Sequence, residues 1–235
     1  MGTLTYTDIE DEVTQALGNR DDITSARKTR IINLAQIRIA RAWRWEELEA
    51  IFDKTLPFTS DAEADKYIAF PDTFRDAYSV VLLDGSRSRK LSRRHTRWID
   101  RRIAMPEHFA RRRPTTYVLW RNIMELWPVQ DAAYKLRARA ITWPTAFVGS
   151  AAPNAVSDFD RKDDMLVALS TSWAFKTVKD DDSANSWWRI YKEMLGLAID
   201  EEQERPDMDS LPDVGVQDSI VAPDPWADPF VRSII

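Results

Sequence analysis

Apolar residues recur at helical spacing through the first 52 residues of the chain. Residues 6–18 read as a short amphipathic helix, with Thr7 placed to cap its start. Its apolar stripe consists of Ile9, Val13 and Leu17. Residues 24–52 contain neither Gly nor Pro and predict one long helix. The two helices are expected to pack against each other in antiparallel orientation.

The long segment carries two apolar stripes rather than one. The first consists of Ile32, Ala35, Ile39, Ala42 and Trp43. The second consists of Leu34, Ile37, Trp45, Leu48 and Phe52. At about 100° per residue, the two stripes lie on opposite sides of a helix. Either both faces pack inside one monomer, or one of them forms a subunit interface.

Between residues 53 and 145 the pattern changes to short strands. The candidate runs are residues 55–58, 67–70, 78–83, 115–121, 123–127 and 134–143. In the last run apolar and polar residues alternate, so that Tyr134, Leu136, Ala138 and Ala140 share one face. The Asp84-Gly85 pair predicts a hairpin. The turn at Pro71 predicts the start of a short helix, because Pro suits the first helical position. A further helix is expected over residues 92–105, with Ser92 as its cap. This region is therefore expected to form a mostly antiparallel sheet layer with a small helix.

Two further helices, over residues 160–179 and 183–204, predict a C-terminal helical hairpin. The expected fold is α+β, with a helical bundle formed by residues 1–52 and 158–204. A β-rich domain of residues 53–145 is inserted into it, and residues 146–157 form a linker. Residues 205–235 are expected to form an extended C-terminal arm.

The arm cannot be a continuous helix, because five prolines interrupt it. It is acidic, yet it carries spaced apolar residues that a disordered tail would lack. These anchors are Ile220, Val221, Trp226, Phe230, Val231, Ile234 and Ile235. The arm is expected to dock into a groove on a partner; the alternative is that it folds back on its own domain.

Composition narrows the possible chemistry. The chain of 235 residues has no Cys and only two His, and its six Gly residues are not clustered. Thiol catalysis, zinc sites and phosphate-cradling loops are therefore not expected. The sequence predicts no enzyme, cofactor or metal site. An acidic, polar N-terminus and the lack of a long apolar run argue against a signal peptide and a membrane span. The expected product is soluble and intracellular, or part of a particle assembled inside a cell.

One stretch is strongly basic although the chain has a net charge of -5. Its arginines are Arg87, Arg89, Arg93, Arg94, Arg97, Arg101, Arg102, Arg111, Arg112 and Arg113. On the expected helix from Ser92, Arg94, Arg97 and Arg101 share one face. Arginine favours bidentate pairing with carboxylates or phosphates. The stretch therefore contacts DNA phosphates, acids of a neighbouring subunit, or acids of its own chain.

The order of several short motifs resembles the head-to-tail adaptor proteins of tailed bacteriophages, the group that includes tail tubular protein A. The motifs are Asn33-Leu34-Ala35-Gln36, Trp43-Arg44-Trp45, Tyr67-Ile68-Ala69-Phe70-Pro71-Asp72, Asp84-Gly85, Pro114-Thr115-Thr116-Tyr117, Leu126-Trp127-Pro128 and Ile141-Thr142-Trp143-Pro144. The resemblance covers roughly residues 4–204, and the basic stretch and the arm depart from the family pattern.

The resemblance implies a structural virion protein at the head-tail interface, assembled in the host cytoplasm. Such adaptors form a ring, commonly dodecameric, under the portal protein. They extend the channel through which DNA passes, without sequence-specific binding, to a downstream nozzle or tail-hub protein. In similar adaptors the C-terminal segment reaches the portal, and the sheet layer faces the tail.

Two other functions remain open. A nucleic-acid-binding protein would use residues 87–113 and would lose DNA affinity steeply with salt. This alternative does not explain apolar anchors in an acidic arm. An enzyme built on paired carboxylates would need a cleft that raises or lowers their pKa values.

Overall fold

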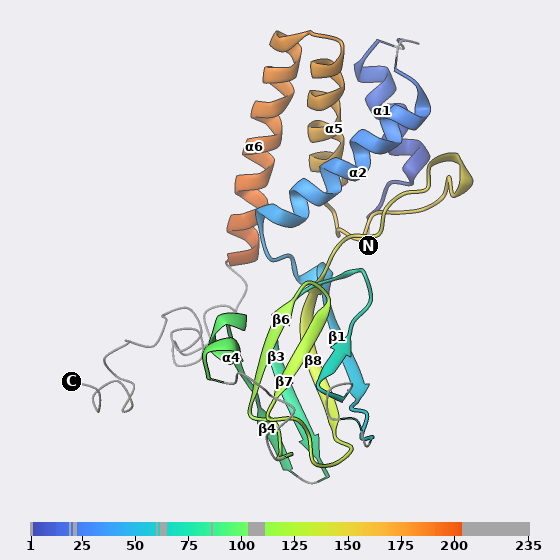
Figure 1. Cartoon of the computed structure of the whole chain (residues 1–235). Helices are drawn as coiled ribbons and strands as arrows, with labels where there is room; N and C mark the ends of the chain where they lie inside the picture. The colour runs from blue at the N-terminus through green and yellow to red at the C-terminus, as the bar shows by residue number, and fades with distance from the viewer. Residues whose placement is uncertain are drawn as a thin grey trace, which may run out of the picture. The chain divides into compact units, whose positions relative to one another are not determined.

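The computed structural model describes residues 2–18, 20, 23–59, 61, 65–85, 87–102 and 111–203. Within these residues the fold is mixed α+β, with five α-helices and two sheets, which confirms the α+β class (Figure 1). The α-helices are α1 (Tyr6–Ala16), α2 (Ser25–Ala42), α4 (Thr96–Arg102), α5 (Asp163–Thr177) and α6 (Asp181–Gln203), and the 3-10 turns are η1 (Glu46–Leu48) and η3 (Gly149–Ala151). The strands are β1 (Glu49–Thr55), β2 (Tyr67–Ala69), β3 (Phe74–Asp84), β4 (Arg87–Lys90), β5 (Ser92–Arg94), β6 (Thr116–Trp120), β7 (Ile123–Trp127) and β8 (Lys135–Thr142).

The chain divides into two compact units, residues 1–194 and residues 195–235. The boundary falls inside α6, and the described part of the second unit, residues 195–203, is helical throughout.

The first helix begins at a complete capping box. The Thr5 hydroxyl accepts the backbone amide of Asp8, and the Asp8 carboxylate accepts the amide of Thr5. The prediction of Thr7 as the cap is therefore wrong by two residues. The helix starts earlier than predicted because Thr5 has an extended backbone conformation and forms a β-bridge with Val156.

The prediction of one helix over residues 24–52 is wrong in its last third. Helix α2 ends at Ala42, because Trp43 has extended backbone angles and the buried Trp45 indole donates to the Ile39 carbonyl at 2.8 Å. This bond occupies a carbonyl that a continuing helix would need. Residues 49–55 instead form β1, which pairs with β8 over seven residue pairs.

Helix α2 therefore has one buried face, made by Ile31, Ile32, Ala35, Gln36, Ile39 and Ala40. The expected second stripe is interrupted, since three of its five members lie beyond the helix. On the remaining part, Leu34 is 48% exposed and Ile37 is half-buried.

Helix α5 is the most enclosed of the described helices. It contacts both α1 and α2, and it is buried on most sides rather than along one stripe. The shared core consists of Val13, Leu17, Ile23, Ile31, Ala174, Phe175 and Ala184. The start of α6 contributes to this core, and the Ser172 hydroxyl donates to the Ala184 carbonyl at 2.8 Å. The helical hairpin expected from residues 160–204 is thus present.

The two sheets have the strand orders β1-β8-β3-β4 and β2-β7-β6-β5. All pairings are antiparallel except that of β5 with β6. Both sheets contribute to one hydrophobic core, with Val80 and Leu136 from the first and Met124 and Leu126 from the second. The Asp84-Gly85 hairpin and the alternation along β8 are both confirmed.

Two short predicted helices in this region are not found. The turn after Pro71 leads directly into β3. Ser92 begins β5 instead of capping a helix, because its amide donates to the Thr115 carbonyl and the strand pairs with β6. Helix α4 starts only at Thr96, where the His95 ring accepts the Arg97 amide. Residues 103–105 of the predicted helix lie outside the described residues.

An N-terminal strap, residues 2–7, runs beside residues 153–157. Backbone amides of Gly2, Tyr6 and Thr7 donate to carbonyls of that segment. At the start of α5, one Asp163 oxygen accepts the amides of Thr3 and Leu4 and the Thr3 hydroxyl, and the other accepts the Ser157 hydroxyl at 2.9 Å. One nearly buried carboxylate therefore fixes the N-terminal strap to the helical core.

We expect Asp163→Ala to lower the free energy of unfolding by about 2–4 kcal/mol, because several partly buried donors lose their acceptor together. The matched control is Asp164→Ala, which removes the neighbouring, exposed carboxylate from the same helix turn. Urea unfolding monitored by circular dichroism measures both. Equal losses for the two variants would contradict the assignment and would point to the helix dipole instead.

Candidate functional site

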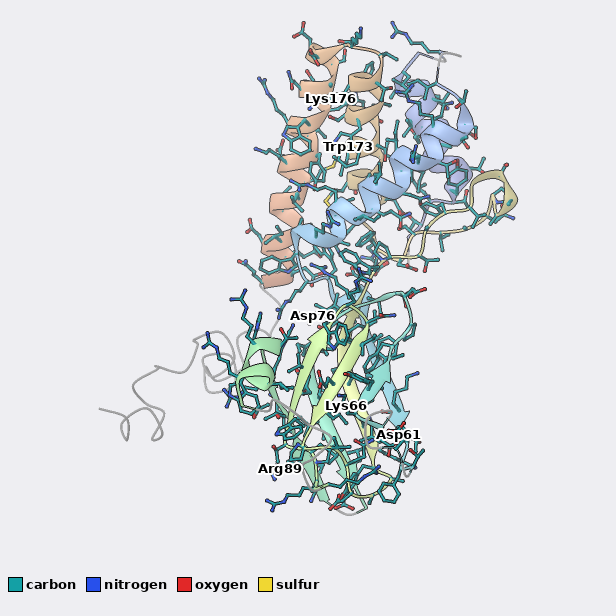
Figure 2. All side chains as sticks on the ribbon, viewed as in Figure 1. Asp61, Lys66, Asp76, Arg89, Trp173 and Lys176 are labelled. Atoms are coloured by element: carbon teal, nitrogen blue, oxygen red, sulfur yellow. The ribbon has the colours of Figure 1, made fainter. Side chains whose placement is uncertain are left out.

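The structure distributes the basic stretch over four separate segments. Strand β4 carries Arg87 and Arg89, and strand β5 carries Arg93 and Arg94. Helix α4 carries Arg97, Arg101 and Arg102, whereas Arg111, Arg112 and Arg113 precede β6. The expectation that Arg94 shares a helix face with Arg97 and Arg101 is wrong, because Arg94 belongs to a strand. In Figure 2, Arg89 lies far along the sheet from Asp76.

One arginine of the stretch forms a buried ion pair. Arg111 Nη1 lies 2.9 Å from an oxygen of Asp65, whose side chain is completely buried. The same carboxylate accepts the Thr59 amide at 2.8 Å and the Thr59 hydroxyl at 2.9 Å. Burial by itself raises the pKa of the Asp65 carboxyl, but the bonds from Thr59 and Arg111 outweigh it, so the pKa lies below its usual value.

Two other arginines pair with exposed or half-exposed acids of the same chain. Arg93 lies 2.9 Å from Asp76, and Arg113 lies 3.4 Å from Asp84. Arg113 also sits 6.0 Å from the Tyr134 ring. Such exposed pairs contribute little to stability. They do reduce the positive charge that this stretch presents to an external partner.

The remaining arginines with described side chains are exposed, namely Arg89, Arg94, Arg97, Arg101 and Arg112. The Arg94 guanidinium lies 5.5 Å from the Trp98 ring, and Trp98 packs with Ile99 against Val118 of β6. Helix α4 is therefore anchored to the outer side of the second sheet, while its Arg97 and Arg101 side chains are exposed.

A second arginine cluster was missed at the level of sequence. Arg41 of α2 and Arg75 of β3 lie 5.6 and 5.0 Å from the same Trp143 ring, and Arg75 donates to the Ala40 carbonyl at 2.6 Å. Burial lowers the pKa of Arg75; Asp76 opposes this shift, whereas Arg44 and Arg41 add to it. The available signal was that residues 25–45 contain no acid.

All seven expected arm anchors, from Ile220 to Ile235, lie outside the described residues. Within the described residues, no group of three or more potential metal-ligating side chains occurs. A helix both long and apolar enough for a membrane span is likewise lacking from that part of the chain.

The lowered pKa of Asp65 determines how the buried pair responds to pH. Its contribution to stability is present above the unfolded-state pKa of about 3.9 and is lost as the pH falls through the lower folded value. We expect Asp65→Asn to lower the free energy of unfolding by about 2–4 kcal/mol at pH 7, since Arg111 keeps its charge. This difference from the wild type should shrink at about pH 3.

Urea unfolding at the two pH values measures the effect. The control is Asp53→Asn, which removes an equally close pair with Arg137 whose side chains are 58% and 48% exposed. The control should lose much less stability. A pH-independent loss in Asp65→Asn would show that packing, rather than charge, makes this site important.

Comparison with known proteins adds to this geometry. A search of curated proteins found no match. The family described as SU10 adaptor protein matches residues 4–214. This match confirms the adaptor resemblance at the level of the family and gives no support to the nucleic-acid-binding alternative; the finer likeness to tail tubular protein A stays a prediction. Because the match covers most of the chain, the chain belongs to the SU10 adaptor protein family.

Proposed function

We propose that the chain is a head-to-tail adaptor of a tailed bacteriophage, built into the virion between the portal protein and the tail. The observation that carries this proposal is the family match over residues 4–214. Several copies form a ring beneath the portal, with twelve as the expected number from the resemblance. The ring extends the channel through which DNA passes to the downstream tail protein, without reading its sequence.

The division of labour within the chain is part of the proposal. Helical segments from residues 1–48 and 158–204 build the ring, and the β-rich part faces the tail. Compared with the division expected from sequence, we assign β1 to the β-rich part, and its pairing with β8 supports this assignment. Assembly takes place in the host cytoplasm before the tail is attached.

The C-terminal arm is proposed to bind the portal. Residues 205–235 contain six Asp and two Arg, yet also Trp226 and Phe230 among their apolar anchors. Large aromatic side chains at a docked segment supply most of the binding free energy, while acids around them favour a basic groove. An arm that orders only on the portal would couple folding to assembly.

The exposed arginines on β4, β5 and α4 are proposed to meet acids of the portal or of a neighbouring subunit. Arg89, Arg94, Arg97 and Arg101 are solvent-exposed in the described structure. Charges at such a rim set the register and the rate of association more than the affinity. DNA phosphates are the less favoured partner, because Arg93, Arg111 and Arg113 already pair within the chain.

Quantitative mass spectrometry of purified phage particles tests the proposed function. An adaptor ring should be present in roughly the same number of copies as the portal subunit, measured from labelled reference peptides of both proteins. A capsid protein of the same particles, with its much larger copy number, serves as the internal scale. Absence of the chain from mature particles would refute the adaptor proposal.

The arm is tested with a chain that ends at Glu204, which keeps all of α6. We expect its affinity for the purified portal to fall at least about tenfold, and Trp226→Ala with Phe230→Ala to give most of that loss. The matched control is Ser233→Ala, a polar position in the same segment. If the truncated chain bound the portal as tightly as the full chain, the arm would have no role in docking.

A further inference from the structure

The exposed face of α2 carries a row of arginines around one exposed leucine. Residues 25–45 contain six basic side chains and no acid. The exposed positions on this face follow each other at intervals of three or four residues, which places them on one side of the helix: Arg27, Arg30, Leu34, Arg38 and Arg41. Within the described part of the chain, none of these arginines forms an ion pair.

Such a face is costly for an isolated chain. Like charges three or four residues apart on a helix repel each other, and Leu34 is 48% exposed between them. A phosphate backbone would neutralise the arginines, but it would leave the leucine uncovered. A partner surface that combines carboxylates with an apolar side chain satisfies both.

Helix α6 presents the complementary arrangement. Leu197 is 66% exposed, and Glu193 and Glu201, four residues before and after it, are also exposed. Arg30 and Arg38 flank Leu34 at the same interval on α2. Four residues rise about 6 Å along a helix, so both motifs place two charges about 12 Å apart with a leucine midway.

We propose that the outward face of α2 in one copy packs against the outward face of α6 in a second copy of this chain. Leu34 contacts Leu197, and each of the two arginines lies opposite one of the two glutamates. Helices in contact lie about 8–10 Å apart, a gap that an arginine and a glutamate side chain bridge together. This proposal rests on the proposed ring, and it identifies the two surfaces that close the ring.

The interface must join two different faces. Two α2 faces would repel each other, and so would two copies of the Glu193–Glu201 face. A contact between unlike faces leaves one free face at each end of a dimer, so subunits keep adding until the ring closes. Opposite charge on the two faces also disfavours wrong pairings.

Cysteine cross-linking tests this contact, because the chain contains no cysteine of its own. A chain that carries both Leu34→Cys and Leu197→Cys is supplied to assembling phage particles. The particles are then oxidised, and their proteins are separated by non-reducing electrophoresis. We expect a ladder of disulfide-linked multimers of the chain. Either substitution alone should give no ladder, since each face meets the other one. A control pair, Leu34→Cys with Gln15→Cys at an exposed position of α1, should not cross-link.

The outcomes separate the interface from the function. Particles that contain the doubly substituted chain but give no ladder would overturn the interface and leave the adaptor proposal standing. Dimers from Leu34→Cys alone would also overturn it, since they require like faces to meet. Absence of even the wild-type chain from particles would refute the adaptor proposal itself.

Charge reversal provides a second test that needs no disulfide geometry. One variant carries Arg30→Glu and Arg38→Glu, and the other carries Glu193→Arg and Glu201→Arg. Each alone should lower incorporation into particles by about tenfold or more. Supplied together, they should restore it and enter in equal amounts, because each reversed face then matches the other variant. If the mixture failed while both variants folded, as shown by circular dichroism, the proposal would be wrong.

Discussion

The early end of α2 is the constraint on which the rest of the structure depends. The Trp45 indole occupies the Ile39 carbonyl, the helix stops, and the following residues become available as β1. Strand β1 then extends the first sheet along β8. Had the helix run on to Phe52, β8 would have an unpaired edge, which invites association with other chains. This buried side-chain hydrogen bond lies at the boundary between the helical residues and β1.

The place of each arginine in the fold, rather than the number of arginines in a segment, decides whether it pairs within the chain or is exposed. The described arginines of the basic stretch divide into three that pair with acids of the same chain and five that are exposed. The buried Asp65–Arg111 pair holds a loop and contributes to folding, whereas exposed charges contribute chiefly to association. The basic surface most suited to a partner lies on α2, outside the stretch that composition alone singles out.

These features fit the proposed adaptor subunit, which binds neighbours on more than one side. The helical core is closed around α5, and the β-sheets have a separate core of their own. Neither core needs a partner to exclude water. In the proposed ring, the exposed faces of α2 and α6 remain for assembly, and their opposite charges favour contacts between unlike faces.

The sequence by itself determined what depends on near neighbours in the chain. The C-terminal helical hairpin, the turn at Asp84-Gly85 and the alternation along β8 follow from local periodicity and turn chemistry. Tertiary structure decided the conformation of segments that have distant partners. Residues 49–55 pair with β8 and residues 92–94 pair with β6, and this pairing overrides the helical pattern of both segments. It also decided which arginines find carboxylates, because those pairs join residues far apart in sequence, and no local signal encodes such distances.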